Sequence, residues 1–151
     1  MGNKVQIIAE IGVNHNGNID LAYEMIDKAS NAGVDFVKFQ TSIPSLVTSI
    51  YAPKAEYQVS TTGSDESMLE MCDRLNLSFD ETGILKSYAA KKEVKFLSTP
   101  FDSVSIDFLD KLGLDCLKIP SGELNNLPYL RQIGKLGKNL IMSTGMAKFR
   151  F

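Results

Sequence analysis

Charged and hydroxyl side chains follow several apolar runs of this sequence, at the points where buried strands are expected to end. The residues whose types suit chemistry there are Glu10, Lys38, Thr99, Lys118, Ser121 and Glu123. Each apolar run has the composition of a parallel strand buried on both faces. Enzymes built on parallel strands gather their sites at the carboxyl ends of those strands. We therefore expect these side chains to form one site.

The two lysines indicate that the site binds an anion. Strand side chains alternate, so Lys38 and Gln40 share one face, and Lys118 likewise lies between apolar neighbours that point the other way. Two lysines held close together in apolar surroundings repel each other unless an anion lies between them. Thr99 and Ser121 add hydroxyl donors at matching strand ends. A carboxylate or a phosphate is the expected ligand.

For several of these residues, a purely structural role is the alternative to a role in binding or catalysis. Lys38 with Glu10, or Lys118 with Glu123, would also be satisfied as ion pairs at the rim of the sheet. The two glutamates are otherwise candidates for binding hydroxyl groups or moving a proton. His15, the only histidine, suits a metal ligand or a turn with a satisfied imidazole, and its Asn-rich, Gly-containing loop favours the turn. The sequence has no glycine-rich nucleotide-binding loop.

The elements that position these residues alternate between strand and helix. Strands are expected over residues 5–11, 34–40, 94–97, 114–119 and 140–142. Helices are expected to begin at Asn18, Ser78, Asp102 and Pro128, and Gly33, Gly113 and Gly137 are expected to end three of them. This order predicts an α/β fold, an incomplete TIM (β/α)8 barrel of about four βα units plus a fifth strand, because a closed barrel needs about 250 residues. An open doubly wound sheet is the alternative, and it would need a helix after Met142.

Residues 41–79 interrupt this alternation with a long insertion. A short helix is expected within it, over residues 64–75. Insertions of this length are usually functional, so the segment is predicted to act as a lid or a substrate wall, with surface decoration as the alternative.

Composition excludes several classes of partner. The 151 residues are 44% apolar and 23% charged, with a net charge of -2 and a pI near 5.4. These values argue against nucleic acid or an anionic membrane surface as the main partner. Cys72, Cys116 and a single histidine indicate neither a zinc site nor a disulfide framework. Without a signal peptide or a membrane-spanning run, a cytoplasmic location is expected.

Six segments in order carry a resemblance to a known family. They are residues 9–17 (AEIGVNHNG), 38–41 (KFQT), 52–58 (APKAEYQ), 98–102 (STPFD), 118–123 (KIPSGE) and 143–146 (STGM). Together they resemble the sialic acid synthase family, which includes N-acetylneuraminate, legionaminate and pseudaminate synthases. The family fold is a TIM barrel followed by a small antifreeze-protein-like domain. The resemblance implies that residues 1–151 are the amino-terminal portion of that barrel, without the rest of the barrel or the carboxy-terminal domain.

The resemblance also implies a reaction. Phosphoenolpyruvate would condense with the open-chain aldehyde of an N-acylated hexosamine, such as N-acetylmannosamine, giving a nine-carbon 2-keto acid and phosphate. By the family pattern Lys38 and Thr99 would hold the donor's carboxylate, and Lys118 and Ser121 its phosphate. Glu10 would contact acceptor hydroxyls, and Glu123 would lie near the reacting carbons. Gln40, Asn14 and Tyr57 are weaker candidates for substrate contacts.

Other parts of the site are expected outside this chain. The family uses a divalent metal, commonly Mn²⁺, held by two histidines that the resemblance places beyond residue 151, so no metal ligand is expected here. Full-length members are expected to be homodimers, whereas this chain is expected to be inactive alone and to self-associate through strand edges at 5–11 and 140–142. The alternatives are a non-catalytic fragment that binds an anion or complements a separately encoded half, and a related phosphoenolpyruvate-dependent 3-deoxy sugar acid synthase.

Overall fold

A parallel sheet of five strands forms the centre of the protein. The computed structural model describes residues 5–62, 65–145 and 147–148. The strands are β1 (Ile8–Gly12), β2 (Phe36–Thr41), β3 (Lys95–Pro100), β4 (Cys116–Ile119) and β5 (Asn139–Met142). They lie side by side in chain order, and every neighbouring pair is parallel. Because the order never reverses among these strands, they form part of a barrel wall and not the doubly wound sheet that the sequence left as an alternative.

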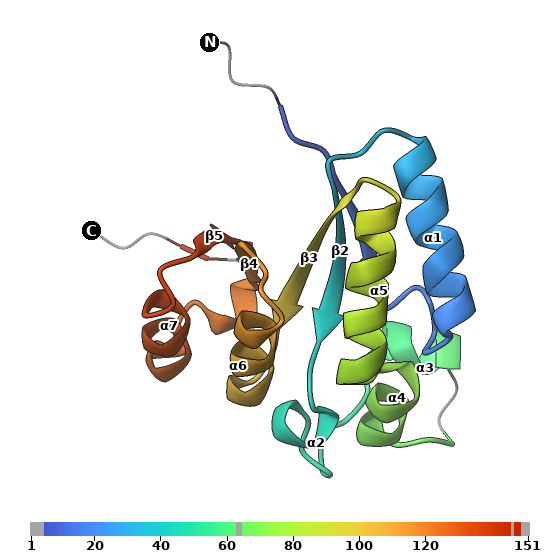
Figure 1. Cartoon of the computed structure of the whole chain (residues 1–151). Helices are drawn as coiled ribbons and strands as arrows, with labels where there is room; N and C mark the ends of the chain where they lie inside the picture. Colours follow the sequence, from blue (N-terminus) through green and yellow to red (C-terminus); the bar gives the residue numbers. More distant parts are fainter. Residues whose placement is uncertain (1–4, 63–64, 146, 149–151) are drawn as a thin grey trace.

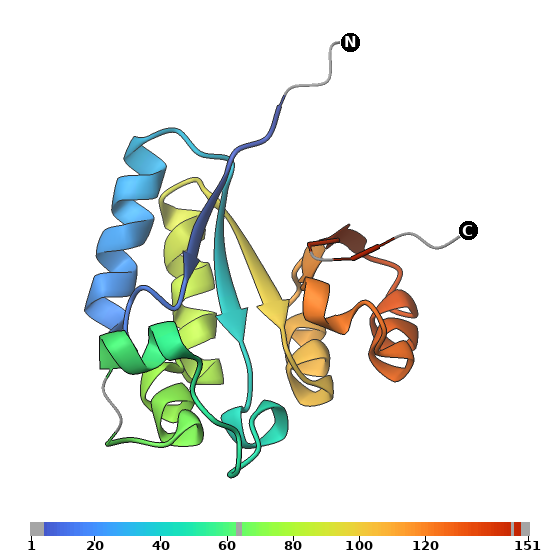
Figure 2. The same ribbon diagram turned by 180° about the vertical axis from the view of Figure 1, so that it is seen from behind.

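Four helices connect the strands and cover one face of the sheet. They are α1 (Ile19–Asn31), α5 (Phe79–Lys91), α6 (Ser103–Lys111) and α7 (Leu127–Gly134). Helix α5 lies in front of the strands in Figure 1 and behind them in Figure 2, and α6 and α7 lie below β4 and β5 in both views. Their predicted starts are confirmed: Asn18 and Asp102 accept backbone N–H groups, and Ser78 forms a capping box with Glu81. None of the described helices is long and apolar enough to cross a membrane.

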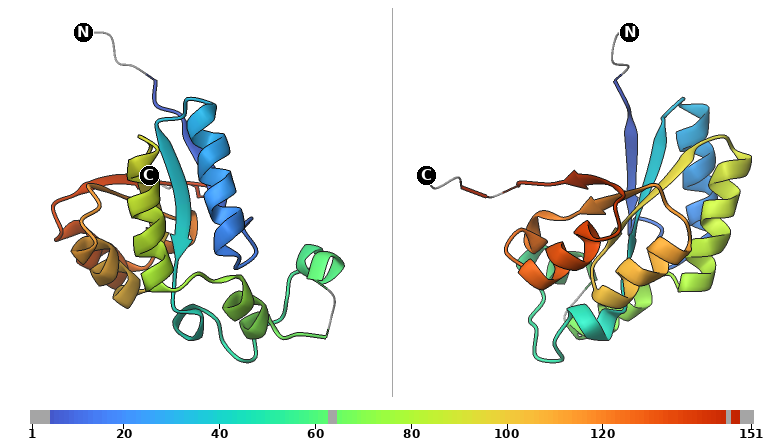
Figure 3. Two further views of the ribbon diagram at one scale, coloured as in Figure 1. Left: turned by 45° about the vertical axis from the view of Figure 1, so that its right-hand side comes forward. Right: turned by 60° about the vertical axis from the view of Figure 1, so that its left-hand side comes forward.

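The covered face of the sheet carries the core. Along β2 the buried residues alternate, with Val37 and Phe39 packed toward the helices and Lys38 and Gln40 on the opposite face. A second buried cluster joins β4 to α6 and α7. Figure 3 shows that β4 and β5 are strongly turned relative to β1 and β2, as in the wall of a barrel. Lys38 and Gln40 therefore face the open side.

Several predicted boundaries are wrong in detail, and the strands expected from residues 34 and 114 begin at Phe36 and Cys116. The first strand begins at Ile8 and not at Val5, because β2 begins only at Phe36 and residues 5–7 have no strand beside them. The third strand continues through Pro100, since its register with β2 extends to Thr41. Helix α7 ends at Gly134 and not at Gly137.

The insertion packs beyond the carboxyl ends of the first strands, below β2 in Figure 1 and Figure 3. It contains α2 (Pro44–Val47), α3 (Glu56–Thr62) and α4 (Met68–Leu75). The predicted helix over 64–75 corresponds to α4, and it starts at Met68 because Ser67 and Glu70 form a capping box. Helices α2 and α3 were not predicted, since neither is long enough to show a periodic apolar pattern.

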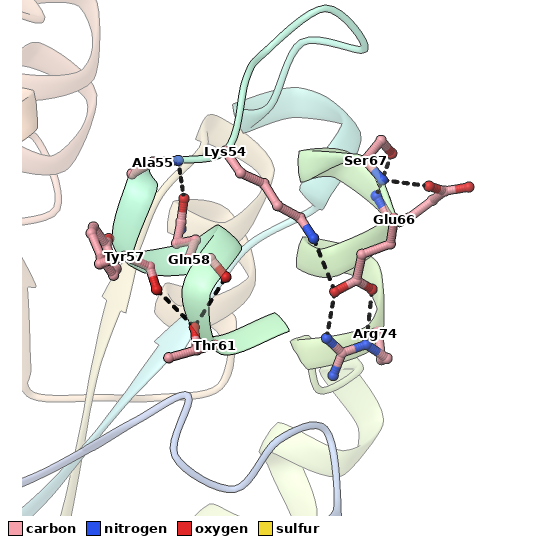
Figure 4. Close-up of polar contacts among 9 residues, drawn as sticks. Lys54, Ala55, Tyr57, Gln58, Thr61, Glu66, Ser67 and Arg74 are labelled. Atoms are coloured by element: carbon pink, nitrogen blue, oxygen red, sulfur yellow. Dashed lines mark hydrogen bonds and ion pairs between the residues drawn. The ribbon is translucent and has the colours of Figure 1, made fainter. Parts of the chain in front are cut away.

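A double ion pair fastens α3 to α4 (Figure 4). Glu66 Oε1 lies 3.2 Å from Lys54 Nζ and 2.8 Å from Arg74 Nη2, and Glu66 Oε2 accepts a second hydrogen bond from Arg74 Nε at 3.1 Å. The Lys54 side chain is only 4% exposed. Arg74, and then Lys54, lower the pKa of Glu66 to about 2, so the carboxylate stays ionised at neutral pH. The charges hold the start of α3 against α4.

The loop after β1 also contacts the insertion, at Gly17. This residue has a φ of +74°, and a Cβ atom placed on it would lie 2.1 Å from the backbone oxygen of Arg74. Only glycine permits both the left-handed conformation and the close approach. Gly17 therefore fixes how the β1 loop and α4 sit together.

We expect Gly17→Ala to destabilise the protein by about 2–5 kcal/mol, from left-handed strain and from the clash with Arg74. Gly33→Ala is the matched control, because Gly33 has a similar φ of +75° and no described atom within 4 Å of an added Cβ. That variant should lose only about 1–2 kcal/mol. Urea unfolding measures both, and equal losses would contradict the close contact at Gly17.

Candidate active site

A cavity of about 350 Å³ opens at the carboxyl ends of the strands, and we call it the lysine cavity. It is lined by Glu10, Gly12, Val13, Asn14, Lys38, Gln40, Thr99, Phe101, Lys118, Pro120, Ser121 and Ser143. These residues come from the ends of all five strands and from the loops that follow them. The structure thus brings together most of the side chains that the sequence singled out.

Lys38 lies at the centre of this cavity with two polar partners. Its Nζ is 2.5 Å from Glu10 Oε2 and donates to Thr99 Oγ1 at 3.4 Å. The pair follows from the strand register, which sets Glu10 of β1 directly beside Lys38 of β2. The Lys38 side chain is 12% exposed, whereas that of Glu10 is 53% exposed. The ion pair that the sequence allowed is therefore present, with its carboxylate on the solvent side.

Lys118 has no carboxylate partner among the described residues. Its Nζ donates to the backbone oxygen of Ile119 at 2.9 Å. Burial, and then the charge of Lys38, lower the pKa of Lys118, and the more distant Glu10 offsets this only in part. The cavity thus holds a positive charge that lacks full compensation, which favours an anionic ligand.

Glu123 and Tyr57 lie away from the lysine cavity. Glu123 ends the short 3₁₀ helix η1 (Ser121–Glu123), and its carboxylate accepts a hydrogen bond from Asn126 Nδ2 at 2.6 Å. The alternative ion pair between Lys118 and Glu123 is therefore wrong, because Glu123 is bonded to a nearer residue of its own loop. Tyr57, on α3, is 70% exposed and lines no part of the cavity. The substrate roles expected of both residues stay predictions.

His15 is a structural residue of the β1 loop. Its buried ring stacks on Phe39 at a centroid distance of 6.0 Å, and Nδ1 accepts the Gly17 N–H at 3.1 Å. Burial lowers its pKa, so the imidazole is neutral at neutral pH. The favoured interpretation, a turn with a satisfied imidazole, is confirmed. Across the residues that the structure describes, no three His, Cys, Asp or Glu side chains gather as a metal site.

Sequence reasoning missed residues that shape the cavity. Ser143 lines it directly, and its position after the fifth apolar run was the signal that could have identified it. The buried carboxylate of Asp102 accepts from the N–H groups of Ile43 and Ser105, each at 2.8 Å, and from Ser105 Oγ at 2.7 Å. It therefore joins the loop after β2 to α6. The hydroxyl of Tyr129 donates to the backbone oxygen of Pro100 at 2.8 Å and fixes the end of β3.

A parallel sheet in unbroken order with a cationic cavity at its carboxyl ends is the architecture of (β/α)8-barrel enzymes that bind anionic substrates. A sequence model of the NeuB family matches residues 25–150. The chain belongs to the NeuB family.

Several known proteins similar to this chain are sugar acid synthases. The chain is 51% identical to an N,N'-diacetyllegionaminic acid synthase of Campylobacter jejuni, over 95% of this chain and 43% of the relative. It is 36% identical to an N-acetylneuraminate-9-phosphate synthase of Mus musculus, over 93% of this chain and 39% of the relative. The crystal structure of an N-acetylneuraminic acid synthetase from Leptospira borgpetersenii superposes with a TM-score of 0.78 at 28% identity, over 98% of this chain and 50% of that one. The chain thus spans less than half the length of the curated relatives named here.

We expect Asp102→Asn to destabilise the protein by about 2–4 kcal/mol, because the amide NH2 replaces a charged acceptor and faces a donor. The control is Asp107→Asn, an exposed residue of α6 whose Oδ1 accepts only from Gln132 Nε2. Its loss should stay below about 0.5 kcal/mol. Urea unfolding of both variants is the measurement, and a neutral Asp102→Asn would show that the carboxylate does not hold the two segments together.

Proposed function

We propose that this chain carries the donor-binding part of a sialic-acid-type synthase. The reaction joins C3 of phosphoenolpyruvate to the aldehyde carbon of an N-acylated hexosamine, water adds at C2 of the donor, and phosphate leaves. The product is a nine-carbon 2-keto sugar acid for surface carbohydrate biosynthesis. Membership of the NeuB family and the names of the relatives support this reaction class. The protein is proposed to act in the cytoplasm, and full-length members to act as homodimers.

The observation that carries the proposal is the pair of lysines in one cavity with two hydroxyl groups. Phosphoenolpyruvate has a carboxylate and a phosphate, and the cavity offers Lys38 with Thr99 and Lys118 with Ser121. We assign the carboxylate to the first pair and the phosphate to the second. Each charged hydrogen bond gained there contributes about 1.5–3 kcal/mol, and bound oxygens would relieve the repulsion between the lysines.

Glu10 gives the site a way to couple the two substrates. In the free chain its carboxylate is paired with Lys38. A donor carboxylate that takes Lys38 as its partner would release Glu10, which is more than half exposed and can then accept hydrogen bonds from acceptor hydroxyls. Glu123, Gln40, Asn14 and Tyr57 stay proposed substrate contacts.

The divalent metal stays a prediction. The described residues contain no group of three carboxylate, histidine or cysteine side chains that suits an ion, so they do not fit a complete metal site. The two histidines expected beyond residue 151 would supply the ligands. The roles proposed above for Lys38, Lys118 and Glu10 do not depend on the metal.

The donor site is tested by titrating phosphoenolpyruvate into the chain by isothermal calorimetry. We expect Lys118→Met to weaken binding about tenfold or more, since it removes one charged hydrogen-bond donor. Lys135→Met removes the same charge from an exposed position and should leave binding unchanged. Equal affinities of the two variants would contradict the assignment of Lys118 to the donor.

Binding should also depend on pH through Lys118. Because its pKa is below the ordinary value for lysine, affinity should start to fall at a lower pH than for an ordinary lysine. A bound anion favours the charged form and raises that pKa, so binding in this range takes up protons. Calorimetry in buffers of different ionisation enthalpy measures the uptake, which Lys118→Met should abolish. If Lys118→Met still takes up protons on binding, the uptake belongs to another group.

We expect Glu10→Gln to strengthen phosphoenolpyruvate binding about two- to fivefold, because it frees Lys38 from a partly exposed ion pair worth up to about 1 kcal/mol. Glu24→Gln is the matched control, since Glu24 is an exposed residue of α1 that does not line the cavity. Calorimetry compares the two, and weaker binding by Glu10→Gln would show that Glu10 does not compete with the donor.

Keto-acid formation from phosphoenolpyruvate, N-acetylmannosamine and Mn²⁺ then tests whether the chain catalyses the reaction alone, which we do not expect.

A further inference from the structure

A second cavity, of about 290 Å³, opens beside the lysine cavity. Val13, Gln40 and Phe101 line both, so the two are separated only by these side chains. Helix α4 contributes Met68, Met71 and Leu75 to the far wall. We call this cavity the side pocket, and its walls join the strand ends to the insertion.

The side pocket has a different charge from its neighbour. No Asp, Glu, Lys or Arg among the described residues lines it, whereas Glu10, Lys38 and Lys118 line the lysine cavity. The one titratable ring in its wall, His15, is held neutral by burial. An ionised ligand group would lose its hydration in the side pocket without gaining a counter-charge. The pocket therefore suits an uncharged group with an apolar end, which Met68, Met71 and Leu75 would contact.

Side-chain amides supply its polar contacts. Gln40 stands at the boundary of the two cavities, and no residue in the described part of the chain hydrogen-bonds to its side chain. Asn76, which also lines the pocket, uses its oxygen to accept from Ser42 Oγ at 3.3 Å, and its NH2 group is a second possible donor. Amide side chains offer both a donor and an acceptor. A ligand amide with one N–H and one C=O is the matching group.

The position of the side pocket beside the lysine cavity suits a substituent of a larger ligand. Sites that enclose a complete small molecule usually have about 300–1,000 Å³, and the side pocket lies just below that range. The rest of the ligand would then occupy the lysine cavity, which adjoins the side pocket at Val13, Gln40 and Phe101.

We propose that the side pocket binds an N-acyl group of the acceptor sugar, with the amide at Gln40 and the acyl chain against the methionines of α4. This inference rests on the proposed function, which supplies an N-acylated sugar beside an anionic donor. It assigns acyl-group selection to the insertion, through the methionines of α4, which sequence reasoning did not single out.

Methionine methyl groups make the inference testable on the chain itself. With [13C-methyl]methionine labelling, N-acetylmannosamine should shift the Met68 and Met71 signals in a saturable way, whereas mannose, which lacks the acyl group, should not. Met25, a residue of α1, packs against the hydrophobic core and not at the pocket, so its signal is the internal control. Equal responses to the two sugars, or no saturable response of Met68 and Met71, would overturn the proposal.

Two substitutions at exposed neighbouring positions of α2 provide the matched comparison. Val47 lines the side pocket and Leu46 does not, and both are exposed enough to accept a larger side chain. We expect Val47→Phe to weaken N-acetylmannosamine binding about tenfold and Leu46→Phe to change it less than about twofold. Met68→Ala enlarges the pocket and should favour N-butanoylmannosamine over the N-acetyl sugar. If Met68→Ala keeps the same preference between the two acyl chains, the proposal that the side pocket binds the acyl group is contradicted.

Phosphoenolpyruvate titrated into 15N-labelled chain, followed at the Ser121 and Gly122 amides, separates this inference from the proposed function. Donor binding without an acyl response would overturn the side pocket alone. An acyl response without donor binding would contradict the proposed function and keep the pocket as an N-acyl site. Loss of both responses in a folded chain, checked by circular dichroism, would overturn both.

Discussion

The repulsion between Lys38 and Lys118 is the constraint on which the site depends. Neither ammonium group can move far away, because each lies on a strand whose neighbours fix its register. Lys38 is partly neutralised by Glu10, whereas the partner of Lys118 among the described residues is a backbone oxygen. The folded chain therefore holds positive charge in a cavity before any ligand arrives. A ligand with two anionic groups would bind there without reorganising the sheet, which is the advantage of a preorganised site.

The parts of this arrangement that follow from local pattern could be predicted from the sequence. Alternation along a strand predicted that the side chains of Lys38 and Phe39 point to opposite faces of the sheet. The spacing of Ser78 and Glu81 identified the start of α5. The convergence of Lys38 and Lys118 followed from a rule about parallel strands, not from their separation in sequence. Strand ends were less predictable, because pairing with the neighbouring strand decides them, as at Ile8.

The contacts that could not be predicted are those for which a side chain has several possible partners, some near in the sequence and some distant. Glu123 had a lysine as a plausible partner, yet the turn of η1 brings Asn126 closer. The sequence predicted a helix over residues 64–75, but not which part of the chain Met71 and Leu75 would meet. Glu66 selects that geometry by pairing with both Lys54 and Arg74, two contacts that no periodic pattern encodes.

The two cavities differ in charge because of where a single strand ends. Lys38 and Gln40 are two residues apart on the same face of β2, and the register places Gln40 beside Thr99 of β3. The same alternation therefore directs an ammonium group into the lysine cavity and an amide to its boundary with the side pocket. Moving the register by one residue would turn both groups toward the helices and bury them in the core. The core packing that fixes Val37 and Phe39 thus also determines that a charged side chain lines the lysine cavity and that a neutral one lies at its boundary with the side pocket.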